Sequence, residues 1–262
     1  MKRERRANDP GFTLIELLIA LAIGSMIATG LVTIFQATQS QVSHAASLED
    51  AQTTARVSLD QMVTELRLIG SYWSGISGVG NAITEATSSS LTFMADVDGD
   101  TLTGSTETTL TADSTSTMLT VSGNASAFNT YATSSGNDYV YVGTGGTREL
   151  KQVASVSGSN ITLASALANA YPAGSSVRSV EKVSYVFDAS AKTLTRTLGG
   201  GSADTVLDNV TALTFTYFDN AGAALAATPT DLSAIKEIRV SLTTRGTGGD
   251  VRTMTSRVRV RN

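Results

Sequence analysis

The chain has 262 residues, a formal net charge of −4 and no cysteine. This length allows one or two domains. The absence of cysteine excludes disulfides, thiol catalysis and cysteine-ligated zinc. The folded part must therefore be held together by its apolar core, for which a hydrophobic share of 41% is sufficient. The charges are unevenly spread, because residues 69–147 contain no Lys or Arg, whereas residues 234–262 contain seven basic residues against two acidic ones.

An apolar segment of membrane-spanning length lies near the N-terminus. Residues 17–35 form a run of 19 uncharged residues, which is long enough to cross a bilayer as a helix. The basic residues that precede it predict a cytoplasmic N-terminus; they are Lys2, Arg3, Arg5 and Arg6. A secretory signal peptide cleaved near residues 43–45 is one alternative, although its apolar region would normally span only about 7–15 residues. An ordinary signal anchor is another alternative, but it does not explain Glu16.

Glu16 is the one charged residue between Gly11 and Phe35. An acidic residue at the centre of a membrane helix costs roughly 2.5–3.5 kcal/mol, and less near its end. The simplest interpretation is a glutamate that reaches the membrane interface. The other interpretation is a carboxylate with a functional partner, which is common for charges inside membranes.

The leader itself favours the second interpretation. A short basic segment ends in Gly11, and Phe-Thr-Leu-Ile-Glu and about twenty apolar residues follow. This arrangement resembles the signal of type IV prepilins and of type II secretion pseudopilins. The resemblance implies cleavage between Gly11 and Phe12 by a prepilin peptidase and N-methylation of Phe12. In the core of a filament, the carboxylate of Glu16 would then neutralise the new amine of Phe12 from a neighbouring subunit.

The helix is expected to continue far beyond the membrane segment. An apolar stripe persists at helical spacing; it comprises Leu48, Ala55, Leu59, Met62, Leu66 and Ile69. The spacing predicts one helix over residues 12–69, roughly 87 Å long, with Gly70 as its stop signal. Residues 1–11 are then a cleaved leader, 12–35 the transmembrane or filament-core part, and 36–70 an amphipathic continuation.

After Gly70 the apolar pattern changes to the period of two that is typical of strands. Short strands are expected at residues 90–95, 118–122, 139–143, 150–156 and 160–163, with a small meander over 139–163. Residues 71–180 are interpreted as a β-rich inserted region. Residues 181–262 are interpreted as an antiparallel sheet with one wet face. In this sheet a turn near 188–192 joins two strands of a hairpin, and Val258 and Val260 face inward.

The predicted fold is therefore α+β: a long N-terminal helix packed on a mainly antiparallel β-sheet head with an inserted β-meander. Residues 65–73, 183–197, 206–219 and 235–245 resemble the heads of minor pilins of the PilW kind and of the J-type minor pseudopilin of type II secretion. The chain lacks the C-terminal cysteine pair of major pilins and is long. Both differences point away from a bulk filament subunit.

The resemblance implies a minor type IV pilin that helps to start assembly at or near the pilus tip. A minor pseudopilin of type II secretion is the first alternative, and a tip-borne module that binds DNA or a surface is the second. The implied partners are prepilin peptidase, other major and minor pilins and the inner membrane. The implied location is the inner membrane in a single pass before assembly, and an extracellular pilus or periplasmic pseudopilus afterwards.

No set of residues predicts an enzyme. His44 is the single histidine, and a catalytic triad or zinc site would need partners that it lacks. The two Gly-Thr-Gly-Gly stretches, at residues 143–146 and 246–249, have no strand–loop–helix context and are interpreted as turns. We expect no required cofactor.

One acidic stretch has the spacing of a calcium loop. Asp96, Asp98, Asp100 and Glu107 occupy positions 1, 3, 5 and 12 of the EF-hand pattern. Gly99, however, stands at position 4 instead of 6, and no helix pattern flanks the stretch. The favoured interpretation is a solvated acidic turn, with Ca²⁺ binding as the alternative.

The last strand is basic. Arg257, Arg259 and Arg261 are expected to project from the same face. They could bind phosphates of a nucleic acid, but no aromatic stacking platform is evident beside them. The favoured interpretation is therefore an edge strand that its charges protect from aggregation.

Overall fold

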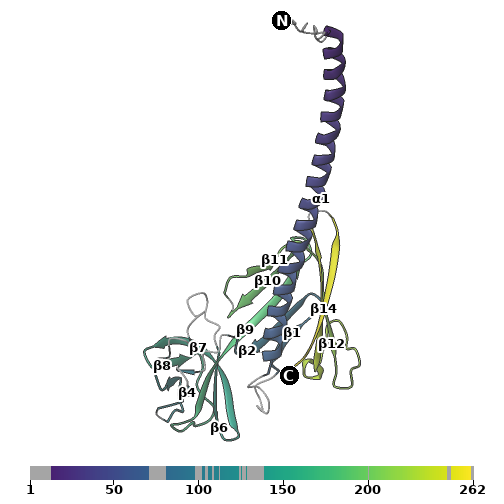
Figure 1. The fold of residues 1–262 in the computed structure, drawn as a ribbon. Coiled ribbons are helices and arrows are strands. Elements are labelled where there is room, and N and C mark those ends of the chain that lie inside the picture. Colours follow the sequence, from purple (N-terminus) through teal and green to yellow (C-terminus); the bar gives the residue numbers. More distant parts are fainter. Residues whose placement is uncertain are drawn as a thin grey trace, which may run out of the picture.

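The structure is a computed structural model that describes residues 13–70, 81–97, 102–103, 106–107, 109–111, 113–123, 125, 128, 139–199, 201–246 and 249–260. One helix, α1 (Leu14–Leu68, 55 residues), projects far out of a β-rich head (Figure 1). After its C-cap, Ile69, comes Gly70 with a φ of 70°, a conformation that glycine adopts without strain. The continuous helix predicted for residues 12–69 is therefore confirmed with small shifts at its ends.

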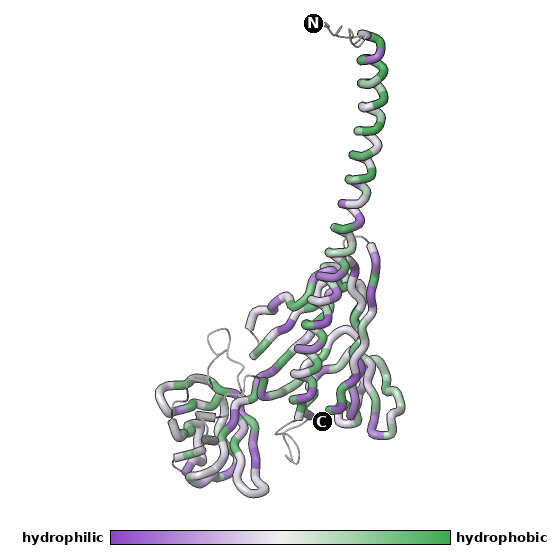
Figure 2. Tube along the Cα trace, in the orientation of Figure 1, coloured by the Kyte–Doolittle hydropathy of each residue, from purple (hydrophilic) through white to green (hydrophobic). Residues whose placement is uncertain are grey.

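The two halves of α1 have different surroundings. Residues 13–43 are exposed wherever their side chains are described, and this half is mostly apolar (Figure 2). The predicted stripe in the second half is buried from Ala55 to Ile69, and Leu48 is half-buried where α1 meets the head. Charged residues that lie off the stripe, such as Arg56 and Asp60, are exposed.

Antiparallel strands form the head. The larger sheet has the order β1-β2-β9-β6-β7-β8-β5, with β10 paired to β9 and β11 paired to β10. Its strands are β1 (Ile83–Ala86), β2 (Ser90–Ala95), β5 (Met118–Thr120), β6 (Tyr139–Thr144), β7 (Thr147–Ser157), β8 (Asn160–Leu163), β9 (Ser176–Asp188), β10 (Thr193–Leu198) and β11 (Asp204–Leu207). The smaller sheet has the order β12-β13-β14, with β12 (Val210–Phe218), β13 (Glu237–Arg245) and β14 (Val251–Arg259). Two short strands, β3 (Leu102–Thr103) and β4 (Thr106–Glu107), pair with each other, and a 3₁₀ turn, η3 (Leu232–Ala234), precedes β13.

The strand β9 connects two parts of the larger sheet. Its first half pairs with β6 and its second half with β2 and β10. The division drawn at residue 180 from the sequence falls inside this strand. The sequence does not reveal that β9 continues through residue 180, because Glu181 is a charged residue in a strand and is nevertheless only 1% exposed. Its carboxylate accepts hydrogen bonds from Val97 N–H at 2.9 Å and from Ser179 Oγ at 2.8 Å.

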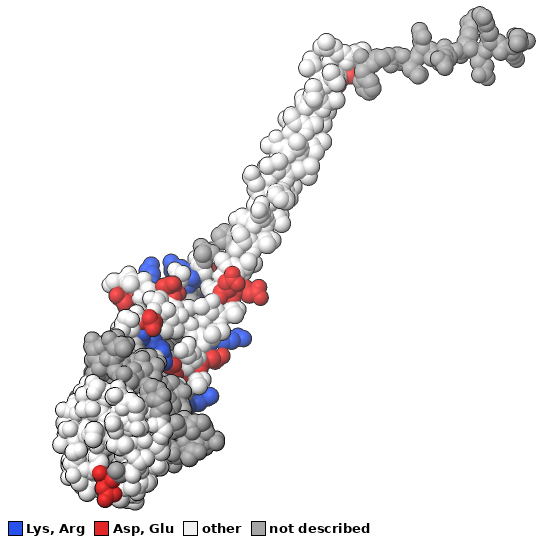
Figure 3. Space-filling view, turned by 90° about the vertical axis from the view of Figure 1, so that its left-hand side faces the viewer, with Lys and Arg blue, Asp and Glu red and all other residues white. Residues whose placement is uncertain are grey.

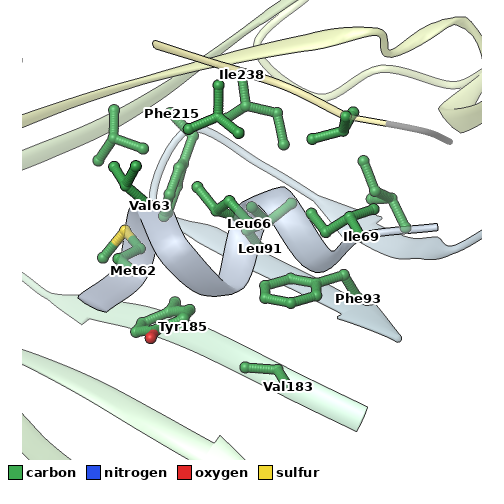
Figure 4. Packing of buried hydrophobic residues seen from close by; sticks show 14 of the residues in the cluster. Met62, Val63, Leu66, Ile69, Leu91, Phe93, Val183, Tyr185, Phe215 and Ile238 are labelled. Carbon is green, nitrogen blue, oxygen red and sulfur yellow. The ribbon is translucent and has the colours of Figure 1, made fainter. Parts of the chain in front are cut away.

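The main core lies around the second half of α1. Figure 4 shows Met62, Val63, Leu66 and Ile69 of the helix between side chains of both sheets. Leu91, Phe93, Val183 and Tyr185 of the larger sheet lie on one side, and Phe215 and Ile238 of the smaller sheet lie on the other. Burying each large apolar side chain contributes roughly 1.5–3 kcal/mol, so this packing fixes the helix to the head.

A second apolar cluster fills a lobe at the end of the head that lies far from the helix N-terminus (Figure 1). It includes Leu119, Phe128, Val140, Ile161 and Tyr171. The strands β6, β7 and β8 are neighbours in this lobe and antiparallel to one another, as predicted for the meander over residues 139–163. The lobe thus has a core of its own, separate from the one under α1.

Candidate assembly site

A capping box begins α1. The side chain of Thr13, the N-cap, accepts a hydrogen bond from Glu16 N–H at 3.3 Å. The Glu16 carboxylate in turn accepts bonds from Thr13 N–H and Thr13 Oγ1, each at 2.9 Å. The N-cap role of Thr13 was not predicted from the sequence. The Thr-x-x-Glu spacing before an apolar run would have revealed it, because this spacing is typical of a capping box.

The cleavage and methylation residues, Gly11 and Phe12, lie outside the described residues. Covalent connectivity alone fixes what cleavage would do, since Phe12 would become the first residue and its amine would stand one residue before Thr13. The Glu16 carboxylate is bonded to Thr13 N–H. Cleavage would therefore place a new positive charge one residue before Thr13.

The exposed half of α1 is suited to a membrane or to the core of a filament. Between Leu14 and Ser47, Glu16 is the one Asp, Glu, Lys or Arg. Figure 3 shows the charged side chains gathered around the head, with a carboxylate near the helix N-terminus. By length and composition α1 qualifies as a membrane-crossing helix. The apolar side chains of this half find no partner within the described part of the single chain.

The hairpin between β13 and β14 touches α1 where the helix leaves the head. A Cβ atom built on Gly246 would lie 3.2 Å from Leu48 Cδ1 and 3.3 Å from Leu48 Cα. A side chain at this position would therefore require Leu48 to shift slightly. Gly249 has a φ of 91° and its N–H donates to Gly246 O at 2.9 Å, which agrees with the turn predicted for this stretch.

A buried ion pair fastens the lower part of α1 to the larger sheet. Glu65 accepts from Arg196 Nη2 at 2.8 Å and from Arg196 Nε at 3.0 Å. Tyr185 O–H donates to the same carboxylate at 2.7 Å. Burial, and then the charge of Glu65, raise the pKa of Tyr185 well above its usual range. The pKa of Arg196 is also raised, because its bonds to Glu65 outweigh the lowering effect of burial. Nothing in the sequence places these residues together, since 131 positions separate Glu65 from Arg196.

A second buried carboxylate organises the distal lobe. Glu149 accepts bonds from Ala168 N–H at 2.8 Å, from Asn169 N–H at 2.7 Å and from Asn169 Nδ2 at 2.8 Å. Lys151 Nζ lies 3.2 Å from it, and Tyr171 O–H donates to it at 3.3 Å. Burial raises the pKa of Glu149, but these hydrogen bonds outweigh burial and the pKa is lowered.

The predicted calcium ligands are only partly described. Asp98 and Asp100 lie outside the described residues, and the side chain of Glu107 in β4 is not described. Asp96 is 9% exposed. Within the described ranges no group of three or more His, Cys, Asp or Glu side chains could hold a metal ion. Calcium binding at this stretch therefore stays a prediction.

One arginine of β13 and one of β14 contact an aromatic ring that was not predicted from the sequence. The guanidinium groups of Arg239 and Arg257 lie 4.8 Å and 5.0 Å from the ring centroid of Phe218. The ring was missed because Phe218 ends β12, two strands away from β14. Phe218 is only 7% exposed, so it offers no open platform on which a base could stack. Arg261 lies outside the described residues.

Comparison with known proteins gives one match. Residues 6–32 match the family model described as the prokaryotic N-terminal methylation motif. The matched segment contains Gly11, Phe12 and Glu16, and it ends within the exposed half of α1. Neither the comparison with curated proteins nor the comparison with solved structures gives a match.

Proposed function

We propose that this chain, which carries a prepilin-type methylation motif as type IV prepilin-like proteins do, is a minor subunit of a type IV pilus that helps to start assembly at or near the tip. The observation that carries the proposal is the first half of α1. It combines the motif at residues 6–32 with an exposed apolar helix and one carboxylate at its N-terminal end. These features support an inner-membrane-anchored protein with a structural role.

The head supports a minor rather than a bulk subunit. A distal lobe with its own apolar cluster extends the head away from the membrane segment (Figure 1). Added bulk of this kind suits a position that few subunits occupy. A minor pseudopilin of type II secretion is the closest alternative, and a tip-borne DNA- or surface-binding module follows it. In all three, prepilin peptidase cleaves after Gly11, Phe12 is methylated, and Glu16 pairs with the amine of a neighbouring subunit.

The first experiment tests processing. Mass spectrometry of the chain purified from membranes should find an N-terminus at methylated Phe12. Replacing Gly11 with a bulky residue should leave the leader attached. An intact Met1, or a start near Ala46, would contradict the proposal.

The second experiment separates the charge of Glu16 from its capping role. Glu16→Gln keeps a side chain that can complete a capping box but removes the charge, whereas Thr13→Val removes the hydroxyl but keeps the carboxylate. We expect Glu16→Gln to be processed normally yet to be depleted from sheared filaments, and Thr13→Val to be retained in them. Equal depletion of both variants from filaments would show that the defect comes from loss of the helix cap. Normal incorporation of Glu16→Gln would show that the charge of Glu16 is not needed for assembly and that the segment acts only as a membrane anchor.

A further inference from the structure

The backbone groups along the outer edge of β14 form no hydrogen bond with the described residues. Within the smaller sheet, β14 pairs with β13 alone. Val260 N–H donates to Lys236 O at 3.0 Å and Gly246 N–H donates to Asp250 O at 2.9 Å, so even-numbered residues form the β13–β14 ladder. In an antiparallel pair the residues between them point their N–H and C=O groups away from the partner. These are Val251, Thr253, Thr255, Arg257 and Arg259.

Two other strands at sheet edges, β12 and β11, accept or donate hydrogen bonds of a kind that β14 lacks within the described part of the chain. On the free side of β12, Phe215 N–H donates to Ser88 O and Leu225 N–H donates to Tyr217 O, each at 2.9 Å. On β11, Ser58 Oγ of the helix donates to Val206 O at 3.3 Å. No comparable bond reaches the outer edge of β14 from the described residues. The nine residues of β14 leave roughly 30 Å of open edge.

Two of the three arginines of β14 are directed across the sheet. Arg257 forms an ion pair with Glu237 on β13 and lies over the Phe218 ring on β12. Arg259 Nη2 donates to Asn220 Oδ1 at 2.8 Å. Both side chains therefore lean across the sheet and away from the edge. The prediction that β14 is an edge strand is confirmed, and protection of this edge by its charges stays a prediction.

We propose that the free edge of β14 binds an extended strand of a neighbouring pilin-type subunit by strand addition. An extended backbone is the partner that can satisfy alternating N–H and C=O groups along a strand. The strand β14 carries three arginines and no acidic residue, so the fitting partner strand is neutral or acidic. This proposal rests on the proposed function, because it takes its partner from the same filament.

The position of β14 restricts the partner further. Figure 1 shows β14 running beside the lower part of α1. A strand added there places the neighbouring head next to this helix, which continues upward into the exposed apolar half. Antiparallel pairing of β14 from two copies would direct their helices oppositely, which anchoring in one membrane does not allow. The partner is therefore a different strand, from a subunit whose helix has the same direction.

Proline substitution tests the edge without breaking the ladder. Thr255 N–H faces the free edge, and proline is tolerated in sheets at such positions. Thr255→Pro in the full-length chain should fold, be processed at Gly11 and enter membranes, yet its amount in sheared filaments should fall at least about tenfold relative to the unmodified chain, since an added strand loses one bond and leaves a carbonyl unpaired. The matched control is Thr255→Ala, which keeps the N–H and should be recovered normally.

Each outcome is informative. Thr255→Pro recovered in filaments at the level of Thr255→Ala overturns the edge assignment alone. An unmodified chain that never enters filaments overturns the proposed function and this inference with it. If Thr255→Pro does not fold, hydrogen exchange of the unmodified chain decides: amides of Thr253, Thr255 and Arg257 should exchange rapidly in detergent and become protected in filaments, and unchanged exchange overturns the proposal.

Discussion

Replacing Glu65 with alanine should weaken the attachment of α1 to the head. The change leaves the guanidinium of Arg196 and the hydroxyl of Tyr185 without their shared acceptor. Breaking a buried ion pair costs about 3–5 kcal/mol. The side chains of Arg196 and Glu65 remain 15% and 10% exposed, so water compensates in part and we expect a loss of about 2–3 kcal/mol. For a domain of this size that loss lowers the melting temperature by about 4–12 °C.

The assay is thermal and urea unfolding of the chain that begins near Gln39. Glu49→Ala is the control, because it removes an exposed carboxylate from the same helix and should change stability by less than about 0.5 kcal/mol. The double variant Glu65→Leu with Arg196→Met should recover most of the loss, since it leaves no buried charge unpaired. If Glu65→Ala has the same melting temperature and urea midpoint as Glu49→Ala, the ion pair does not hold the helix to the sheet.

Three other predictions concern the hairpin at Gly246, the carboxylate of Glu149 and the acidic stretch that contains Asp98. Gly246→Ala should destabilise the head by about 1 kcal/mol in urea unfolding, because the new Cβ would press on the Leu48 backbone; unchanged stability would show that the hairpin yields freely. Glu149→Gln should destabilise the distal lobe by about 1–2 kcal/mol at pH 7. Because the pKa of Glu149 is lowered in the folded state, the ionised carboxylate stabilises the fold fully at pH values above its ordinary pKa of 4.5, and this stabilisation is lost as the pH falls through the lower folded pKa. The difference in melting temperature between the variant and the unmodified chain should therefore shrink below pH 4.5. A difference that stays constant with pH would contradict the charge-based explanation. Millimolar Ca²⁺ should raise the melting temperature of the head, and Asp98→Ala should abolish this rise; a head that melts identically with and without Ca²⁺ would leave the solvated-turn interpretation.

The helix and most strands could be predicted because local patterning determines them. Strands β2 and β8 match the predicted residues 90–95 and 160–163. The hairpin turn predicted near 188–192 lies between β9 and β10, and Lys192 adopts a positive φ of 58° there. Turns and strands of this kind are predicted by the pattern of neighbouring residues in the sequence.

The parts that were missed depend on contacts between distant residues. Strand β1 has four residues, with buried ends and an exposed middle, so it lacks the period of two and is recognisable only by its pairing with β2. Strand β11 was missed as well, and its length of four residues gives a weak local signal. In β9, the buried Glu181 interrupts the apolar alternation and concealed the first part of the strand.

Glu16 and the β14 edge also differ in whether neighbouring residues or distant contacts determine them. Glu16 was identified from its neighbours in the sequence, because a carboxylate in an apolar run is unusual wherever the chain folds. Neighbouring residues also predicted that β14 is an edge strand. They could not predict the directions of Arg257 and Arg259, because the partners of these side chains, Glu237 and Asn220, lie elsewhere in the chain.

The attachment of α1 explains how a head could be positioned by a helix that is mostly exposed. Two contacts bracket the buried part: Leu48 against Gly246 at the upper end and Glu65 against Arg196 at the lower end. They are 17 residues apart, or about 26 Å along the helix. Apolar packing between these points fixes the helix axis, and the paired charges at the lower end oppose its sliding or rotation. A displacement of the apolar half among neighbouring helices would therefore move the head as a body. The orientation of the β14 edge would then follow from that of α1, and this is the coupling that strand addition between subunits with parallel helices requires.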